Sequence, residues 1–344
     1  DEVRSSLNQL AYEAHADQAS RRPMLDIPSG KLIDRLMAIN QNPEVEPQRL
    51  VDYLSRRAGL LVPRGMDRYA FPHRVFQEYL AACYLTDSGY PDRVAALARK
   101  DPEHWGAVAL LAGAKSAGGS EFALWALVDA LCDRDIADDD LQSEQDGWGA
   151  LLAGQILVEN ADLTRVSDPN DGNVARVQKH LARVLSAGTL PASERVGAGR
   201  ILAKLGDLRP GVGLRDDGLP DILWCEVPAG PFLMGSADED PWAYADEKPQ
   251  HTYAIAAPYA ISRYPITNAQ FSAFVEAGGY HRERYWSERG WAWRGCEEIV
   301  GPSEFGGPWN LPNHPRVGVN WYEAMAFCRW LTDRLRERGG LAED

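Results

Sequence analysis

The stretch that decides the fold of the C-terminal part is Asn313–Leu331, with the sequence NHPRVGVNWYEAMAFCRWL. Asn320 is followed three positions later by Glu323, a spacing in which each side chain can bond the other residue's backbone N–H at a helix start. The pattern therefore predicts a helix that begins after Asn320 and continues through Trp330. We expect it to end at Gly339-Gly340, because glycine readily adopts the left-handed conformation that closes a helix.

A second helix of the same kind is predicted upstream. Thr267 and Gln270 repeat the capping spacing, and the helix they open is expected to stop at Gly278-Gly279. Before it, three apolar segments bounded by Gly and Pro predict short strands. These segments are 222–228 and 230–235, which flank a turn, and 252–261. Between the two helices, residues 280–319 carry Trp and Gly with little periodicity, which predicts an elaborated loop held by aromatic packing.

Residues 1–213 differ in kind, because they are rich in Ala, Leu and Arg and their apolar residues recur at helical spacing. The stretch from His73 to Thr86 predicts a helix with one broad buried face. That face consists of Val75, Phe76, Tyr79, Leu80, Cys83 and Tyr84. Further helices are predicted at 93–99, 104–113, 121–132, 148–159, 174–186 and 193–205. Breaks such as 116–120 and 167–172 separate them, and without a strict repeat period they predict a bundle or irregular solenoid.

Residues 47–71 carry a different pattern ahead of these helices. A helix, a strand, a turn and a returning strand over 47–58, 60–63, 64–67 and 68–71 form the outline of a winged-helix unit. Arginines including Arg56 and Arg57 make this stretch locally basic, which is compatible with DNA recognition. Because the whole chain is strongly acidic, we favour a structural spacer and keep DNA binding as the alternative.

Composition excludes several classes of protein. The 344 residues include 50 acidic and 36 basic side chains, a formal net charge of -14, so a general basic field for nucleic acid is absent. Every apolar stretch is broken before about 18 residues and no signal-peptide core opens the chain, so we expect a soluble cytoplasmic protein without membrane contact. Five widely spaced cysteines without a CxxC favour reduced, buried thiols over disulfides.

The segment 206–220 is rich in Gly, Pro and Asp and predicts a linker between domains. The predicted organisation is a winged-helix-like region with its following helix over 1–86, a helical array over 87–205, this linker, and a C-terminal domain over 221–344. The two folded parts have different compositions, so we expect them to be separate domains.

Residue spacing gives no ready-made catalytic site. His251 and His281, the closest pair among seven histidines, are 30 positions apart, so no helix presents paired histidines to a metal. Gly30-Lys31 lacks the earlier glycine and the following Ser or Thr of a phosphate-binding loop, and no Gly-x-Ser-x-Gly elbow is present. We therefore predict no catalytic, cofactor-binding or metal-binding residue in this chain.

Tryptophan is concentrated in the C-terminal part, where eight of the eleven follow residue 213. Trp321 and Trp330 on the second capped helix are expected in the core. The candidates for a ligand or partner surface are Trp286, Trp291, Trp293, Arg294 and Trp309. Tryptophan and arginine dominate interaction hot spots, which favours this interpretation. Core packing of a loop-rich domain explains the same residues, so both interpretations stay open.

Four ordered blocks resemble a formylglycine-generating-enzyme-like domain, the sulfatase-modifying-factor variant of the C-type lectin fold. The blocks are VPAGPFLMGS at 227–236, ExPxH at 247–251, YPITNAQF at 264–271 with GGY at 278–280, and the stretch 313–331 quoted above. The resemblance implies an α+β domain over 221–344. Because the family completes this domain with more sequence, we expect the N-terminal half of it here, and therefore an incomplete domain.

A second resemblance covers the N-terminal part. The segment Tyr69–Ala82, YAFPHRVFQEYLAA, resembles the region just after the winged helix in NACHT-type STAND NTPases, where a helical arm follows. The resemblance implies ATP and Mg²⁺ only for a nucleotide-binding core upstream of this chain. The implied fold class is multidomain, with an all-α winged-helix and helical-array region followed by the α+β lectin-like domain.

The resemblance to the enzymes of this family has limits that bear on function. Their catalysis depends on a copper-binding cysteine pair in the later part of the domain, and related iron enzymes use a three-histidine motif. We expect neither before Asp344, and no catalytic role is carried over to Cys225, Cys296 or Cys328.

The two resemblances together imply a non-catalytic recognition and regulatory region of a NACHT-type signalling or defence ATPase. Some lectin-like proteins of this kind are variable proteins of diversity-generating retroelements. Expected partners are a protein, peptide or glycan ligand, the upstream NTPase domain, and further copies of the chain on activation. A peptidyl-cysteine oxidase whose copper-binding half lies outside the chain is the first alternative, and a winged-helix DNA binder is the second.

Overall fold

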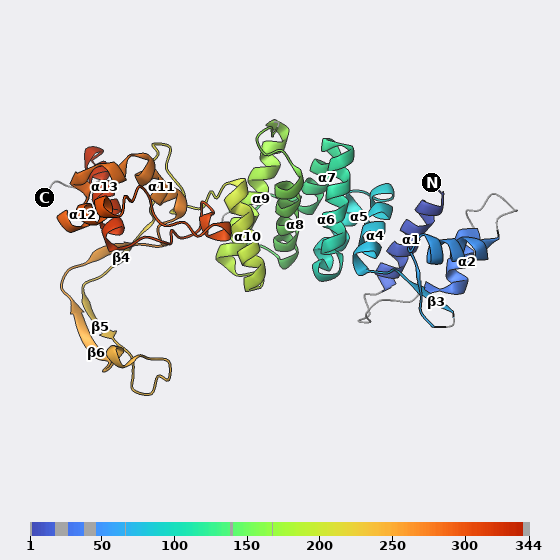
Figure 1. Ribbon diagram of the computed structural model, residues 1–344, viewed down its shortest axis with the longest axis horizontal. Coiled ribbons are helices and arrows are strands. Elements are labelled where there is room, and N and C mark those ends of the chain that lie inside the picture. The colour runs from blue at the N-terminus through green and yellow to red at the C-terminus, as the bar shows by residue number, and fades with distance from the viewer. Residues whose placement is uncertain are drawn as a thin grey trace. The chain divides into compact units, whose positions relative to one another are not determined.

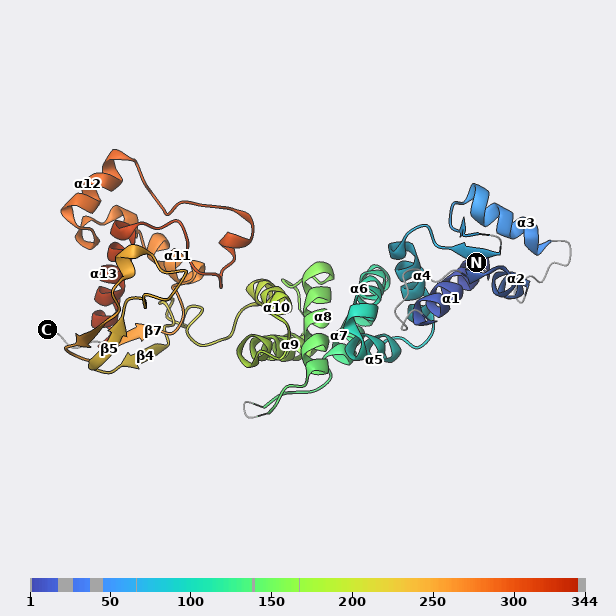
Figure 2. The same ribbon diagram turned by 90° about the horizontal axis from the view of Figure 1, so that it is seen from below.

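The computed structural model describes residues 2–17, 27–37, 46–65, 67–137, 140–166 and 168–339. The chain divides into two compact units, unit 1 over Asp1–Gly206 and unit 2 over Asp207–Asp344. Figures 1 and 2 show both, coloured from blue at the N-terminus to red at the C-terminus. The segment 206–220, expected as a linker, starts at this division. From Asp207 onward it packs within unit 2, where Val212 and Leu219 are buried.

The first part of unit 1 consists of short helices around a small sheet. Its elements are α1 (Glu2–Asp17), β1 (Ile27–Pro28), α2 (Ser29–Met37), α3 (Pro47–Asp52), the π-helical turn η2 (Tyr53–Arg57), β2 (Val62–Pro63) and β3 (Arg68–Ala70). The strands are antiparallel in the order β1-β3-β2, around a core that includes Leu10, Leu32 and Leu54. The predicted helix and returning hairpin are confirmed, and Met66 in the predicted turn lies outside the described residues. The region is not all-α, because β1, too short to give a sequence pattern, adds a third strand.

The rest of unit 1 is a row of helices. They are α4 (Arg74–Asp87), α5 (Asp92–Lys100), α6 (Pro102–Gly119), α7 (Glu121–Leu131), α8 (Glu144–Asn160), α9 (Asp168–Ala187) and α10 (Ala192–Leu205). Neighbours in the chain contact each other, and α8 also contacts α6 and α10, as Figure 1 shows. All predicted helices here are confirmed. None of the described helices, in either unit, is both long and apolar enough to cross a membrane.

Two predicted breaks between these helices are wrong in extent. Helix α6 continues through most of the predicted break at 116–120 as far as Gly119, and the Ser116 hydroxyl donates to the carbonyl oxygen of Ala112 at 2.7 Å within that turn. Helix α9 begins at Asp168 and so takes up most of the predicted break at 167–172, whose Ser167 lies outside the described residues. The predicted breaks therefore displaced the end of α6 and the start of α9 by four and five positions.

Helix α4 is present as predicted, but its predicted buried face is only partly right, because Cys83 is buried while three of its six residues are exposed. Val75, Phe76 and Tyr79 are 53%, 52% and 41% exposed. The buried side chains are Gln77, Glu78, Ala81, Ala82, Cys83 and Leu85. Helices α1 and α6 contact this second face, where the small alanine side chains let the backbones approach closely. Close helix packing, rather than side-chain size, decides which face of α4 is buried.

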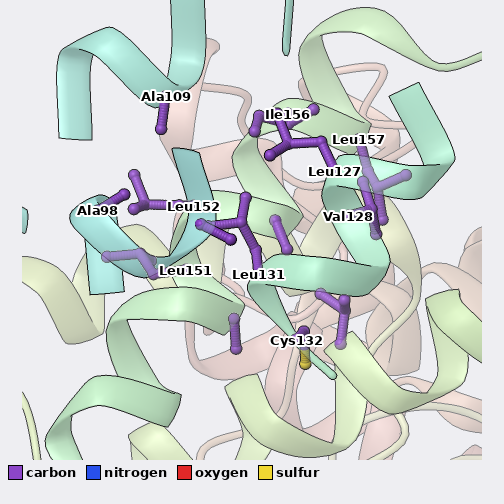
Figure 3. Packing of buried hydrophobic residues seen from close by; sticks show 14 of the residues in the cluster. Ala98, Ala109, Leu127, Val128, Leu131, Cys132, Leu151, Leu152, Ile156 and Leu157 are labelled. Atoms are coloured by element: carbon purple, nitrogen blue, oxygen red, sulfur yellow. The ribbon is translucent and has the colours of Figure 1, made fainter. Parts of the chain in front are cut away.

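One hydrophobic core runs through the row of helices. Figure 3 shows Leu127 and Leu131 of α7 close to Leu152 and Ile156 of α8. Helix α8 approaches its neighbours too closely for a side chain at two glycines. A Cβ at Gly149 would lie 2.2 Å from the carbonyl oxygen of Leu131, and one at Gly154 would lie 2.8 Å from Ile201. These glycines are therefore required by packing.

The five cysteines are free thiols that fall into two groups. Cys83 and Cys132 in unit 1 are buried as predicted, and burial raises the pKa of Cys132 to about 12. Cys225, Cys296 and Cys328 in unit 2 are exposed, so the prediction of burial is wrong for them. Cys328, for example, follows the core residue Phe327 by one position on a helix, which turns its side chain off the buried face.

Unit 2 begins with four short strands in two separate antiparallel pairs. Strand β4 (Trp224–Val227) pairs with β7 (Tyr259–Ser262), and β5 (Gly230–Met234) pairs with β6 (His251–Ile255). The first two predicted strands are confirmed, although they do not pair with each other. The predicted strand 252–261 is two strands, because a bend separates them. In Figure 1 the β5–β6 hairpin extends away from the helices of unit 2.

The helices of unit 2 carry its core. They are α11 (Asn268–Glu276), α12 (Glu288–Cys296) and α13 (Trp321–Glu337), with short 3-10 turns η3 (Ala245–Glu247), η4 (Gly279–His281), η5 (Glu283–Tyr285) and η6 (Gly307–Asn310). Both predicted capping boxes are formed, at Thr267 and at Asn320. Gly278 and Gly339 close the two helices with positive φ, and Gly340 lies outside the described residues. The predicted loop 280–319 is wrong in part, because it contains α12.

Aromatic rings fill the space between α11 and α13. Phe271 stacks on Phe327 with ring centroids 5.3 Å apart, and Phe274, fully buried, lies 5.7 Å from Trp330. Trp330 is 2% exposed, which confirms the prediction that it belongs to the core. Ring pairs at these distances stabilise beyond the area they bury, and they fix the relative positions of the two helices.

In unit 1, α1 and α6 meet at a pair of stacked histidines. The rings of His15 and His104 lie 14° from parallel, with centroids 4.1 Å apart. His15 Nε2 is 3.0 Å from the carbonyl oxygen of His104, and His104 Nε2 is 2.7 Å from that of His15, so each ring donates its Nε2–H to the other residue. Trp105 packs edge-on against both rings. Burial, followed by the neighbouring His104 ring, lowers the pKa of His15 to about 4.

We expect unit 1 to lose stability in acid because of this pair. His15 takes up a proton near pH 6.5 when unfolded but only near pH 4 when folded, so its contribution is complete above pH 6.5 and is lost as the pH falls toward 4. The loss is on the order of 3 kcal/mol. Urea unfolding at pH 7.5, 5.5 and 4.5 measures it in the wild type and in His15→Gln, which keeps an N–H donor but does not titrate.

His180→Gln is the control for this pH series. It replaces a different buried histidine, whose pKa burial also lowers, and leaves the stacked pair of His15 and His104 in place. Besides His104, Arg74 and Asp101 are the charged side chains that act on His15. The same loss of stability in the wild type and in His15→Gln would contradict a role for the stacked pair.

Candidate functional site

Four of the five candidate residues lie on or next to α12 in unit 2. Ser287 caps this helix by accepting the N–H of Gly290 at its hydroxyl, at 3.1 Å. A Cβ at Gly290 would lie 3.1 Å from the side chain of Tyr322, so α12 packs closely on the first turn of α13. The cap and the close contact place the tryptophans of α12 in fixed positions.

Trp286 belongs to the core and not to the surface. Its side chain is 5% exposed, its Nε1–H donates to the carbonyl oxygen of Gly279 at 3.0 Å, and its ring lies 5.3 Å from that of Tyr280. Both its indole N–H and its ring therefore make their contacts inside unit 2. We therefore remove Trp286 from the candidate ligand surface.

Trp291, Trp293 and Arg294 are half-buried and contact neighbours inside unit 2. The Arg294 guanidinium lies 4.3 Å from the Trp291 ring centroid, a cation–π contact. The Trp293 ring lies 5.9 Å from that of Tyr322. The contact between Trp293 and Tyr322 joins α12 to α13. Because all three side chains are half-buried, only part of each is open to a ligand.

Trp309 has an exposed side chain on an anchored backbone. It lies in η6 and its side chain is 56% exposed. Its carbonyl oxygen accepts the side-chain N–H of Asn268, which is buried on α11, at 2.6 Å, and the same Asn268 donates to the carbonyl oxygen of Leu311 at 2.9 Å. The ring of Trp309 is thus presented to solvent from a fixed position.

Trp321 was expected in the core and is instead 73% exposed. It is the first residue of α13, whose buried side chains are Glu323, Ala326, Phe327, Trp330 and Leu331. Those residues fall on one helical stripe with spacings of three and four, and Trp321 is outside it. The helical period could therefore have identified Trp321 as a surface residue.

Phe305 is one of the exposed aromatic residues that the sequence did not identify. It is 63% exposed, and a Cβ at Gly318 would lie 2.8 Å from its ring. Ser303 donates its N–H to the carbonyl oxygen of Gly318 at 3.0 Å, and Arg316 donates to the carbonyl oxygen of Ser303 at 2.9 Å. These contacts tie the segment before η6 to the segment before α13. We group the three exposed rings Phe305, Trp309 and Trp321, which lie on or next to these segments, under the name aromatic surface.

A buried hydrogen bond links η4 to the first turn of α13. The Tyr280 hydroxyl donates to Glu323 Oε1 at 2.6 Å, and Glu323 Oε2 accepts the N–H of Asn320 at 2.8 Å. Glu323 is 3% exposed. Burial, together with the Glu323 carboxylate, holds the pKa of Tyr280 well above its usual range, so the phenol keeps its proton and remains the donor.

A second polar network fixes the start of unit 2. Asp207 accepts both Nε and Nη2 of Arg209, at 2.9 and 2.7 Å, and the side-chain N–H of Asn313 at 2.8 Å. Burial opposes ionisation of Asp207, but these hydrogen bonds outweigh it and lower its pKa. The network joins the first residues of unit 2 to the segment that begins at Asn313, although the two are 106 positions apart in the chain.

The described residues do not supply the ligand set of a copper or iron site. Within them, no three His, Cys, Asp or Glu side chains gather so that they could hold a metal ion. Cys225 lies in β4, Cys296 ends α12 and Cys328 lies on α13, so the three thiols of unit 2 belong to different elements. No metal-dependent step is therefore assigned to these side chains.

Two protein-family models match segments at the two ends of the chain. Residues 220–338 match the family described as a sulfatase-modifying factor enzyme 1-like domain, and residues 1–85 match the winged helix-turn-helix domain C-terminal to NACHT. The chain thus joins a NACHT-associated winged-helix domain to a sulfatase-modifying-factor domain. Both resemblances drawn from the sequence blocks are confirmed at this level.

Similar curated proteins are enzymes that share only part of this chain. Hercynine oxygenase of Mycolicibacterium smegmatis is 34% identical over 151 residues, which are 38% of this chain and 34% of that protein. Formylglycine-generating enzyme of Thermomonospora curvata is 33% identical over 140 residues, 32% of this chain and 44% of that protein. Hercynine oxygenase of Mycobacterium tuberculosis is 33% identical over 116 residues, 30% of this chain and 27% of that protein. The chain therefore spans less than half the length of these relatives.

We expect Tyr280→Phe to destabilise unit 2. The substitution keeps the ring but leaves Glu323 Oε1 buried without its donor, which costs about 1.5–3 kcal/mol. Urea unfolding followed by tryptophan fluorescence measures the change. Tyr322→Phe is the control, because among the described residues the Tyr322 hydroxyl has no hydrogen-bond partner. Equal stability of the two variants would contradict a structural role for the Tyr280–Glu323 bond.

Proposed function

We propose that this chain is a non-catalytic recognition and regulatory region of a NACHT-type signalling ATPase, with unit 2 as its ligand-binding module. The ligand would be a protein, a peptide or a glycan. The observation that carries the proposal is the aromatic surface, in which three large rings are exposed on anchored backbone. Exposed rings held rigid lose little entropy when they bind, which is why tryptophan is frequent in hot spots.

The anchoring of the aromatic surface supports recognition over simple exposure. Trp309 is held through Asn268 of α11, and Phe305 through the contacts of Gly318 and Arg316. Trp321 begins a helix whose start is fixed by the Asn320–Glu323 capping box. Isolated exposed apolar residues are common in soluble proteins, but several rings on immobile supports are typical of binding surfaces.

The winged-helix part supports the regulatory half of the proposal. Residues 1–85 match a domain whose family lies C-terminal to NACHT, which supports an upstream nucleotide-binding domain as the proposed partner on that side. ATP and Mg²⁺ would belong to that domain, and this chain would hold no cofactor of its own. Helices α1 and α4 contact each other, and α4 contacts α6, so the winged-helix part and the helical array form one body. Such a body can transmit a displacement to further copies of the chain during assembly on activation.

Oxidation of a peptidyl cysteine is a second candidate function, favoured by the 33% identity to a formylglycine-generating enzyme. The residues described in this chain do not fit a copper site, so the metal-binding part would have to come from outside it. The test is aldehyde formation on a cysteine-containing peptide by the protein that carries this chain, with and without added copper. Aldehyde in the copper-loaded sample would favour the oxidase over the recognition module.

We expect a ligand selected on this chain to depend on the aromatic surface. A random-peptide phage library and a glycan array are the two probes, with the full chain as the target. The selected ligand should bind about tenfold or more weakly to Trp309→Ala and to Trp321→Ala. Isothermal titration calorimetry measures the change in Kd.

Trp242→Ala is the matched control for these variants, because Trp242 is 90% exposed but lies between β5 and β6 rather than on the aromatic surface. It should bind the selected ligand as the wild type does. Selection of no ligand from either probe, or an equal loss in Trp242→Ala, would sink the proposal.

A further inference from the structure

A cluster of arginines that includes none of the residues of the aromatic surface surrounds one buried tyrosine in unit 2. Tyr285 ends η5 and is 1% exposed. Its hydroxyl oxygen accepts Nη2 of Arg284 at 2.6 Å and Nη2 of Arg334 at 3.3 Å. Arg282 also donates a side-chain hydrogen bond to it. Three guanidinium groups, two from η5 and its N-cap and one from α13, therefore converge on a single phenol oxygen.

The negative charges around this cluster do not balance it. Asp333 lies 4.0 Å from Arg284 Nε, and Glu337 lies 2.7 Å from Arg334 Nη1. Among the described residues, no carboxylate lies within 4.0 Å of Arg282. Three positive charges thus face two negative ones, and like charges held close together are unfavourable unless an anion compensates them.

The hydrogen-bond donors of the cluster are also in excess. All three partners of the Tyr285 hydroxyl are donors, so within the described residues its own O–H has no acceptor. The buried Nε–H of Arg334 has no partner there either. Burial opposes ionisation of Tyr285, but the hydrogen bonds from Arg334, Arg284 and Arg282 outweigh it and lower the pKa of the phenol. A cluster that has unpaired hydrogen-bond donors but no unpaired acceptor is complementary to an anion whose oxygens only accept hydrogen bonds.

The Tyr285 ring holds the arginines in place. The Arg284 guanidinium carbon lies 4.8 Å from the Tyr285 ring centroid, so this side chain stacks on the ring as well as bonding its hydroxyl. The side chains of Arg284 and Arg334 are 54% and 27% exposed, and Tyr285 lies beneath them. The guanidinium groups are thus pre-positioned at the surface, with N–H groups open to solvent.

We propose that Arg282, Arg284 and Arg334, positioned by Tyr285, form a binding site for a tetrahedral oxyanion, such as the phosphate or sulfate group of an ester. Guanidinium forks match the oxygen spacing of such groups and bind them with paired hydrogen bonds. A bound dianion would change the net charge of the cluster from positive to negative, and its oxygens would accept hydrogen bonds from the unpaired donors. The site is independent of the ligand proposed for the aromatic surface, and its residues are not shared with it.

Titration of the full chain with small anions tests the site. Inorganic phosphate, inorganic sulfate, phenyl phosphate and sodium acetate are the probes, measured by isothermal titration calorimetry at constant ionic strength because exposed charges are screened by salt. Phosphate or sulfate should bind saturably, and acetate at least about tenfold more weakly, since a carboxylate offers fewer acceptors. Tighter binding of phenyl phosphate than of inorganic phosphate would identify an ester as the ligand, and equal binding would identify the free anion.

Arg282→Gln and Arg284→Gln should each weaken phosphate binding by about tenfold or more. Both side chains are exposed, so the fold is kept, and near-ultraviolet circular dichroism checks this. Arg289→Gln is the control, because Arg289 is an exposed arginine of α12 outside the cluster. No saturable binding of phosphate or sulfate, or an equal loss in Arg289→Gln, would overturn the proposal. Binding of a peptide or glycan by Trp309→Ala is measured in a separate experiment. A failure of the anion site can therefore be distinguished from a failure of the aromatic surface.

Discussion

The Glu323 carboxylate is buried in unit 2, and the positions of its neighbours depend on it. It accepts the backbone N–H of Asn320 and the hydroxyl of Tyr280, so the first turn of α13 and the turn η4 are joined through one side chain. A buried carboxylate is stable only when its oxygens are paired, so neither partner can move away without a large cost. The aromatic rings of α11 and α13 pack in the space that this bond defines, and Trp321 projects to solvent from the same fixed turn.

Short-range patterns in the sequence correctly predicted where helices begin. The apolar pattern did not correctly predict which side chains are buried. The capping spacings at Thr267 and Asn320 depend only on residues a turn apart, and both boxes are formed. The exposed face of α4 was missed because the close approach of α1 and α6 favours alanine over larger apolar side chains. The pairing of β4 with β7 joins residues separated by a hairpin, and nothing in either strand specifies that partner.

The candidate site was predicted in part, for the same reason. Tryptophan content pointed to the segment after η4, and Trp309 is indeed exposed there. Composition could not separate Trp286, whose N–H bonds a backbone carbonyl in the core, from a ring free in solvent. The arginines around Tyr285 also carry no sequence signature, because Arg334 reaches the cluster from a helix about fifty residues further along the chain.

The β5–β6 hairpin has a consequence for the dynamics of unit 2. Among the described residues each of its strands pairs with the other alone, and Phe232, Leu233 and Tyr253 on it are 43%, 68% and 54% exposed. A two-stranded ribbon with so little burial has a low free energy of local opening, so its amides exchange with solvent long before those of α11 and α13. Among the described residues its outer edges are also unpaired, so they are open to the addition of a further strand.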